Sequence, residues 1–215
     1  MDIKALAKKY EPYIIERRRY FHAHPELSFK EWETTKALVA EFEKMGMEIQ
    51  TFPDYPGLIA TLDTGKPGRT VMLRADIDAL PVKEGTGLDF ASQNEGVMHA
   101  CGHDNHMAML LGAAHILLEK KDELKGKVKF LLQSGEEMAC GAKYYVDHHI
   151  LDGVDAIFGQ HIWGTLDAPY VCVASGNRMA SCDNFTIRVK GLQSHGSAPQ
   201  DGHDAIVAAS AIVMA

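Results

Sequence analysis

The chain has 215 residues, of which 46% are hydrophobic and 24% are charged, so it has a globular composition with room for one large core or slightly more. Its formal net charge of −7 disfavours nucleic acid and anionic membranes as partners, because both require a basic surface. No apolar run approaches the ~18 residues that a membrane span needs, so we expect no membrane insertion.

The N-terminal residues are amphipathic and lack the apolar segment of a secretory signal. The four cysteines, at positions 101, 140, 172 and 182, are irregularly spaced. We therefore expect reduced thiols and a cytoplasmic protein.

Two helices are predicted at the start of the chain. Apolar residues at helical spacing predict the first over residues 3–22, and Pro25 limits its extent. Ser28 and Glu31 have the spacing of a capping box, which predicts that a second helix opens there and continues to about Lys44.

Strand and helix patterns alternate over the following residues. Strands are predicted over residues 48–52, 58–63, 70–77, 127–133 and 156–160. Helices are predicted over residues 104–120 and 141–149. This alternation predicts an α/β domain with a mixed, mostly parallel sheet and helices on both faces.

The pattern changes after Ala168. Residues 170–174 and 185–189 are strand-like, and residues 204–215 predict a helix in which the chain stops. We expect one domain over residues 1–182 and the beginning of a second over residues 183–215.

Chemically capable side chains lie where the predicted strands end or the long helix begins. They are Asp76, Asp78, Cys101, His103, Glu136, Glu137 and His161. Open α/β sheets bind ligands beyond the carboxyl ends of their strands, so these groups are expected to converge at one edge.

Their donor types suit Zn²⁺, and also Co²⁺, Ni²⁺ or Mn²⁺. A metal lowers the pKa of bound water to about 7, and a free carboxylate can then carry its proton. Because Glu136 and Glu137 are adjacent and point in different directions, one can bind metal while the other acts as the base.

Each residue also has a structural explanation. Cys101 can be a small buried residue, His103 a core histidine, the glutamate pair a solvated loop, and His161 a packed ring. Asp76 and Asp78 can either orient a metal-binding histidine or cap strand ends. We expect a structural or rim role for His22 and His24 and packing roles for His106 and His115. Inert thiols are expected at Cys140, Cys172 and Cys182.

Five segments occur in a specific order. They are Arg18-Arg-Tyr-Phe-His22-Ala-His-Pro-Glu-Leu-Ser28, Leu73-Arg-Ala-Asp76-Ile-Asp78-Ala-Leu-Pro81, Met98-His-Ala-Cys101-Gly-His103-Asp104, Gln133-Ser-Gly-Glu136-Glu137 and Gly159-Gln-His161. Together they resemble the M20 metallopeptidases, in particular the amidohydrolase branch that contains hippurate hydrolases, N-acyl-amino-acid amidohydrolases and indole-acetyl-amino-acid hydrolases. The resemblance covers essentially the whole chain.

This resemblance implies a zinc-peptidase-like catalytic domain with two divalent metal ions, which can be Zn, Mn, Ni or Co. The implied ligands are Cys101, His103, Glu137 and His161, with Cys101 as the bridge, and Glu136 is the implied general acid/base. Other branches carry His-x-Asp where this chain has Asp76-Ile-Asp78, so both aspartates are expected to support the ligands.

The segment from Phe185 to Ala205 resembles the start of the family's α+β lid or dimerisation domain. It implies that His195 reaches across a homodimer of the full-length protein and helps hold the substrate carbonyl. Family members run to nearly twice this length and supply one more metal-binding histidine. We therefore expect this chain alone to have an unfinished second metal site and little or no activity.

The expected reaction is hydrolysis of the amide bond of N-acyl amino acids or small peptides by a hydroxide held between two metals, with Glu136 as base. Two alternatives stay open. One is a cysteine hydrolase with Cys101 as nucleophile and His103 or His161 as base. The other is a metal-binding module without catalysis.

Overall fold

The computed structural model describes residues 2–181, 183 and 185–215. Two compact units are present, one ending at Val171 and the other beginning at Cys172, and each is described by itself. The domain boundary predicted after residue 182 stays a prediction, and Cys182 lies outside the described residues. Across the described ranges, no helix is both long and apolar enough to cross a membrane.

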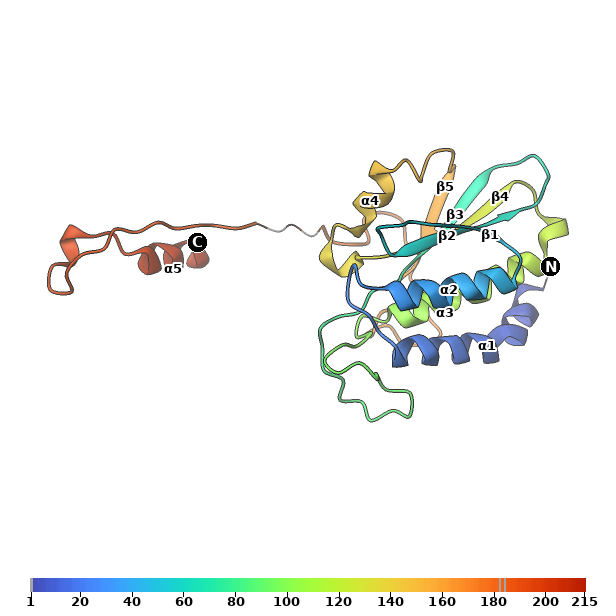
Figure 1. Cartoon of the computed structure of the whole chain (residues 1–215), viewed down its shortest axis with the longest axis horizontal. Helices are drawn as coiled ribbons and strands as arrows, with labels where there is room; N and C mark the ends of the chain where they lie inside the picture. Colours follow the sequence, from blue (N-terminus) through green and yellow to red (C-terminus); the bar gives the residue numbers. More distant parts are fainter. Residues whose placement is uncertain (1, 182, 184) are drawn as a thin grey trace. The chain divides into compact units, whose positions relative to one another are not determined.

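The first unit alternates helices and strands along the chain (Figure 1). Its elements are α1 (Ile3–Ala23), α2 (Trp32–Lys44), β1 (Glu48–Thr51), β2 (Gly57–Asp63), β3 (Thr70–Asp76), α3 (His103–Glu119), η1 (Lys121–Glu123), β4 (Lys127–Gln133), η2 (Glu136–Met138), α4 (Gly141–Asp147) and β5 (Ala156–Gly159). The helices and strands predicted for this unit are therefore confirmed, with small differences at their ends.

The strands form one sheet in the order β1-β2-β4-β3-β5. β3 runs parallel to both β4 and β5, whereas β2 pairs antiparallel with β1 and β4. The predicted mixed α/β sheet is thus confirmed, with its parallel part confined to β4, β3 and β5. Asp76 pairs with Gln133 and Arg74 with Gly159, so the carboxyl ends of these three strands meet at one edge.

Helices cover both faces of the sheet (Figure 1). α1, α2 and α3 lie on one face, where Leu38, Phe42 and Leu111 pack with alternate strand residues such as Phe130. On the other face Tyr145 of α4 packs against Ile59, Met72 and Leu131. Full burial of each large apolar side chain contributes about 1.5–3 kcal/mol, so the two layers fix the strand ends firmly.

The capping box predicted at Ser28 and Glu31 is wrong. Glu31 is the residue before α2, but its side chain makes no capping hydrogen bond. The Ser28 hydroxyl instead donates to Asp78 Oδ2 at 2.7 Å, and the Glu31 carboxylate accepts from Ser134 Oγ at 2.7 Å. Both side chains bind the ends of strands rather than their own helix, because those buried polar groups need partners.

The second unit contains η3 (Pro199–Asp201) and α5 (Ala205–Met214). The Asp204 carboxylate accepts hydrogen bonds from the backbone N–H groups of Ile206 and Val207, which explains where α5 begins. The strands predicted over residues 170–174 and 185–189 are not formed. Among the described residues these segments pair with no strand, and an isolated strand is not stable without such pairing.

Candidate metal centre

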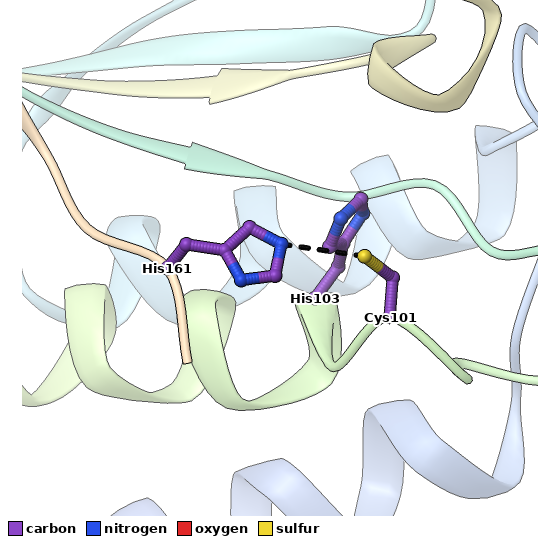
Figure 2. A group of neighbouring side chains, drawn as sticks. All are labelled: Cys101, His103 and His161. Carbon is purple, nitrogen blue, oxygen red and sulfur yellow. Dashed lines mark hydrogen bonds between the residues drawn. The ribbon is translucent and has the colours of Figure 1, made fainter. Parts of the chain in front are cut away.

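Cys101 lies in the turn that leads into α3, and His103 is the first residue of that helix (Figure 2). Gly102 between them has a φ of +93°, a conformation that residues with a side chain rarely adopt. A Cβ atom there would lie 2.3 Å from Cδ1 of Ile162, so the Ile162 side chain packs directly on this glycine. Both the backbone conformation and the packing of Ile162 therefore require a glycine between Cys101 and His103.

His103 is completely buried and has a defined orientation. Its Nδ1 lies 2.8 Å from the Asp78 carbonyl oxygen and 3.3 Å from Asp78 Oδ1, so Nδ1–H donates to Asp78. Nε2 then carries the lone pair, as a metal-binding imidazole requires. Burial lowers the pKa of His103, but the carboxylates of Asp78 and Asp76 outweigh this effect and raise it.

Cys101 and His161 face each other across the site (Figure 2). Cys101 Sγ lies 3.3 Å from His161 Nε2, and His161 Nδ1 faces the carbonyl oxygen of Ile162. Burial and the nearby Glu137 carboxylate raise the pKa of the Cys101 thiol to about 12. A divalent cation would reverse this preference, because a thiol that binds a metal is deprotonated.

Glu136 and Glu137 begin η2, directly after β4 and a turn at Gly135. Gly135 has a φ of +70°, and a Cβ atom there would lie 2.2 Å from the ring of Phe29. Glu136 Oε2 lies 3.8 Å and Glu137 Oε1 3.7 Å from His103 Nε2. Burial raises the pKa of Glu137, whereas the neighbouring His103 and Cys101 lower it.

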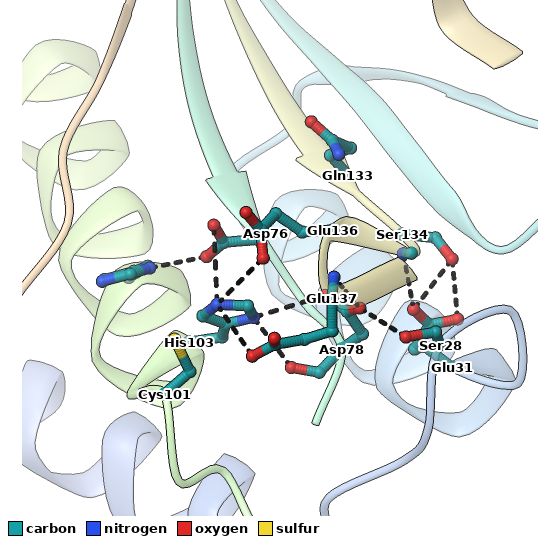
Figure 3. Close-up of polar contacts among 12 residues, drawn as sticks. Ser28, Glu31, Asp76, Asp78, Cys101, His103, Gln133, Ser134, Glu136 and Glu137 are labelled. Carbon is teal, nitrogen blue, oxygen red and sulfur yellow. Dashed lines mark hydrogen bonds and ion pairs between the residues drawn. The ribbon is translucent and has the colours of Figure 1, made fainter. Parts of the chain in front are cut away.

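Asp78 connects the ligand candidates to one another (Figure 3). Besides its contact with His103, its Oδ2 accepts hydrogen bonds from Ser28 Oγ at 2.7 Å and from the Glu137 backbone N–H at 2.9 Å. These hydrogen bonds hold the pKa of Asp78 below its usual value although burial raises it. Asp78 thus fixes both His103 and the turn that carries Glu137.

Asp76, at the end of β3, is occupied by two other partners. Its Oδ1 lies 2.5 Å from His106 Nδ1, and its Oδ2 accepts from Arg74 at 2.7 Å. The pKa of Asp76 is lowered because these contacts and the nearby His103 outweigh the effect of burial. With both oxygens engaged, Asp76 is better placed to support the site than to bind a cation.

Three groups of side chains among the described residues have donor atoms within 4.8 Å of one another, and each includes His103. They are Cys101 with His103 and His161, His103 with Glu136 and Glu137, and Asp76 with His103 and His106. The structure therefore places Cys101, His103, Glu136, Glu137 and His161 close together, and their role in metal binding and catalysis stays a prediction.

The residues present fit a metal ion. His103 Nε2 and Glu137 Oε1 are buried, have no hydrogen-bond partner among the described residues, and lie 3.7 Å apart. Buried polar atoms are normally paired, and two that face each other at this distance can share a cation. The accompanying thiol, imidazole and carboxylates are the donors that Zn²⁺ and similar ions prefer.

His106 also belongs to this arrangement, although the sequence predicts only a packing role for it. His106 is 2% exposed, and it contacts Asp76 through Nδ1 and the Ile162 backbone N–H through Nε2. The spacing of three residues between His103 and His106 could have indicated it, because such residues share one side of a helix.

A second buried network holds the first turn of α3. Asp104 lies 2.8 Å from His22 Nδ1 and forms an ion pair with Arg18 at 2.9 Å. His22 Nε2 also lies 3.1 Å from Glu84. These contacts tie α1 and the long loop before α3 to the start of the helix that carries His103.

His195 belongs to the second unit, and its Nδ1 lies 2.9 Å from the Ser197 hydroxyl. Its predicted role in holding a substrate carbonyl stays a prediction.

Known proteins resemble both the sequence and the fold. Residues 72–213 match Peptidase family M20/M25/M40. An N-acyl-L-amino acid amidohydrolase from Geobacillus stearothermophilus is 40% identical over 213 residues, which make up 99% of this chain and 58% of that protein. An N-acetylcysteine deacetylase from Bacillus subtilis is 43% identical over 207 residues, 96% of this chain and 54% of that protein.

Solved structures agree with these relatives. A dinuclear metal binding peptidase of the M20 family from Bacillus subtilis is 44% identical and gives a TM-score of 0.70 over 76% of this chain and 45% of its own. A protein from methicillin resistant Staphylococcus aureus is 41% identical, with a TM-score of 0.84 over 100% of this chain and 58% of its own. The chain spans about half of the length of the curated relatives it matches.

Proposed function

The chain belongs to peptidase family M20/M25/M40, and on this basis we propose that the full-length protein hydrolyses the amide bond of N-acyl amino acids or small peptides at a centre of two divalent metal ions. The observation that carries the proposal is the facing pair of His103 Nε2 and Glu137 Oε1, both buried and without a hydrogen-bond partner among the described residues. The names of the relatives, an amidohydrolase and a deacetylase, support the class of substrate.

In this proposal Cys101, His103, Glu137 and His161 would hold the metal ions. Zn, Mn, Ni and Co all suit this set of donors. When bound, the ions supply positive charge that polarises the scissile carbonyl and makes a water molecule more acidic.

Glu136 is the proposed general base and acid. It lies beside Glu137 and is 38% exposed, so it can reach water and substrate while Glu137 stays with the ligands. Glu136 takes a proton from the attacking water as the new carbon–oxygen bond forms. It then gives that proton to the leaving nitrogen as the carbon–nitrogen bond breaks.

The remaining residues orient this chemistry. Asp78 holds His103 with its Nε2 lone pair toward the ligands. In a homodimer of the full-length protein, His195 of a neighbouring chain would steady the substrate carbonyl as negative charge develops on it. The proposed compartment is the cytoplasm, where a thiol such as that of Cys101 stays reduced.

The alternative of a cysteine hydrolase is less well supported. A nucleophilic cysteine needs a lowered pKa, whereas burial and Glu137 raise the pKa of Cys101 to about 12. A metal-binding module without catalysis would use the same ligands but would not need Glu136.

The proposal is tested with Glu136→Gln in the full-length protein and a panel of N-acyl amino acids. We expect the variant to lose roughly 10²–10⁴-fold in rate because proton transfer is lost, and to keep its metal content. Removal of metal with a chelator should abolish the activity of the wild-type protein.

Two results would contradict the mechanism. If Glu136→Gln behaves as the wild type does in the substrate panel, Glu136 is not the general base, and a metal-binding module without catalysis is favoured. Activity that survives the chelator but is lost in Cys101→Ala would favour the cysteine hydrolase.

A further inference from the structure

His106 is the least expected member of the centre. It lies one helical turn after His103 in α3 and is 2% exposed. Its buried ring has polar as well as apolar neighbours. It contacts the ring of His161 edge-to-face, with 4.6 Å between the ring centroids. Both of its nitrogen atoms have polar partners.

These partners determine which nitrogen carries the proton. Nε2 lies 3.0 Å from the backbone nitrogen of Ile162, which can only donate, so Nε2 accepts. Nδ1 of a neutral ring then bears the hydrogen and donates to Asp76 Oδ1 at 2.5 Å. The Asp76 carboxylate thus selects the tautomer that can bind Ile162.

Asp76 is itself held rigidly. Its other oxygen accepts from Arg74 at 2.7 Å, and Arg74 Nε donates to Gln133 in the neighbouring strand β4 at 2.9 Å. The support for His106 therefore comes from the central strands of the sheet rather than from a flexible loop.

The backbone of Ile162 connects His106 to His161. Its backbone N–H is bound by His106, and its carbonyl oxygen is the acceptor that His161 Nδ1 faces. With Nδ1–H used in this way, the lone pair of His161 lies on Nε2, 3.3 Å from Cys101 Sγ. The Ile162 side chain also packs on Gly102, between Cys101 and His103.

We propose that His106 is a positioning residue, which takes its tautomer from Asp76 and holds the Ile162 peptide so that His161 directs Nε2 at Cys101. The consequence for metal binding rests on the proposed function, whereas the hydrogen bond to Ile162 does not. The segment after β5 needs such an anchor, because β5 has only four residues and ends at Gly159.

Two substitutions test the two hydrogen bonds of the His106 ring separately, the one to Asp76 and the one to the Ile162 backbone. His106→Asn can keep a donor near Asp76 but cannot reach Ile162, because its amide occupies the place of Nδ1. His106→Gln can place an oxygen where Nε2 was and so can still accept from the Ile162 N–H, but it leaves Asp76. His115→Asn is the matched control, since it makes the same change in α3 at a ring that stacks on Tyr10.

The first readout is the hydrogen-exchange rate of the Ile162 backbone amide, measured by NMR in metal-free protein. We expect faster exchange in His106→Asn, and protection near that of the wild type in His106→Gln and His115→Asn. The ¹⁵N shifts of the His106 ring in the wild type should show hydrogen on Nδ1 and a lone pair on Nε2.

The second readout is the affinity for Co²⁺ alone and its ligand-field spectrum. Outer partners of metal ligands typically contribute ~10- to 100-fold in affinity, so His106→Asn should weaken Co²⁺ binding by about that factor. His106→Gln should lose less, and His115→Asn should bind as the wild type does.

Unchanged Ile162 exchange and unchanged Co²⁺ affinity in His106→Asn would overturn the inference, as would hydrogen on Nε2 in the wild type. If the wild-type protein binds no Co²⁺, the proposed function fails instead. The exchange of Ile162 and the ring shifts then still decide whether His106 positions this segment.

Discussion

Glu31 shows how one buried carboxylate shapes the centre without being a candidate ligand. It is 0% exposed and accepts hydrogen bonds from Ser134 Oγ and from the Gly135 backbone N–H at 3.0 Å. These two residues immediately precede Glu136 and Glu137 (Figure 3). Glu31 therefore holds the turn that presents both glutamates, from the start of a helix more than a hundred residues earlier in the chain.

Glu31 should make the stability of the protein depend on pH. Burial raises its pKa from 4.5 to about 7, although the hydrogen bonds from Ser134 and Gly135 oppose the shift. The folded protein therefore keeps this proton to a higher pH than the unfolded chain does. The stabilisation is complete below about pH 4.5 and is lost as the pH rises through about 7, a loss of about 3 kcal/mol.

Urea denaturation at pH 5, 6, 7 and 8 checks this prediction. The free energy of unfolding of the wild type should fall relative to that of Glu31→Gln as the pH rises, because glutamine has no proton to lose. Glu33→Gln, two residues further along and with an exposed side chain, is the control and should follow the wild type. A constant difference between wild type and Glu31→Gln at all four pH values would contradict the prediction.

The ligand candidates were easier to locate from the sequence than their supports. Cys101, His103, Glu137 and His161 could be found because each follows a strand or opens a helix. The sequence around Glu31 instead predicts a capping box, and His106 is predicted to be a packing residue. The hydrogen-bond partners of both side chains are far away in sequence, so local spacing does not identify these partners, although the three-residue spacing from His103 places His106 on the same side of α3.

At the scale of elements, the turn into α3 is the most constrained part of the centre. Gly102 combines a left-handed backbone with direct contact to Ile162. Gly96 in the preceding loop also has a positive φ, of +76°, but a Cβ atom added there would meet no atom of the described residues within 4 Å. Comparing substitutions at the two glycines therefore separates the cost of backbone strain from the cost of displacing the Ile162 side chain.

Gly102→Ala should destabilise the protein more than Gly96→Ala. Both substitutions force alanine into a left-handed conformation, which costs about 1–2 kcal/mol, but only Gly102→Ala also displaces Ile162. Chemical denaturation measures the two losses. Adding Ile162→Ala to Gly102→Ala should recover part of the difference, and equal losses in the two single variants would rule out the packing contribution.

The ends of elements were also predictable to different degrees. The apolar runs of β2, β3 and β4 are bounded by glycine, proline or charge, and their predicted ends differ from the observed ones by no more than one residue. Residues 170–174 and 185–189 have equally strand-like compositions but do not form strands. β propensity describes residues that fit a sheet surface, and it does not supply the neighbouring strand.

At the scale of the whole molecule, the match over residues 72–213 confirms the family that the motifs indicated. The motifs are informative together because the sheet topology brings them to one edge. β4 and β3 are parallel neighbours, and their last residues, Gln133 and Asp76, are paired. The turns that follow the two strands therefore begin at the same edge of the sheet.

Metal should stabilise the first unit against unfolding. A ligand at one hundred times its dissociation constant adds about 2.7 kcal/mol, which for a domain of this size raises Tm by roughly 5–10 °C. Thermal melts of chelator-treated and Co²⁺-loaded protein measure the shift. His103→Ala should remove it, since all three groups of candidate ligands include His103. An equal shift in that variant would place the stabilising ion elsewhere.

The edge position of β5 divides the centre into a firm and a loose half. Among the described residues, β5 is joined to the sheet only through β3, over four residue pairs, and Ile157 and Phe158 are more than half exposed. His161 follows this edge strand by two residues, whereas His103 begins α3 and Glu137 lies in η2, directly after the central strand β4. In hydrogen exchange, the amides of β5 should therefore exchange before those of β3 and β4, and bound Co²⁺ should slow β5 most. A metal ion held by residues from both places would therefore tie the edge strand β5 to the rest of the sheet.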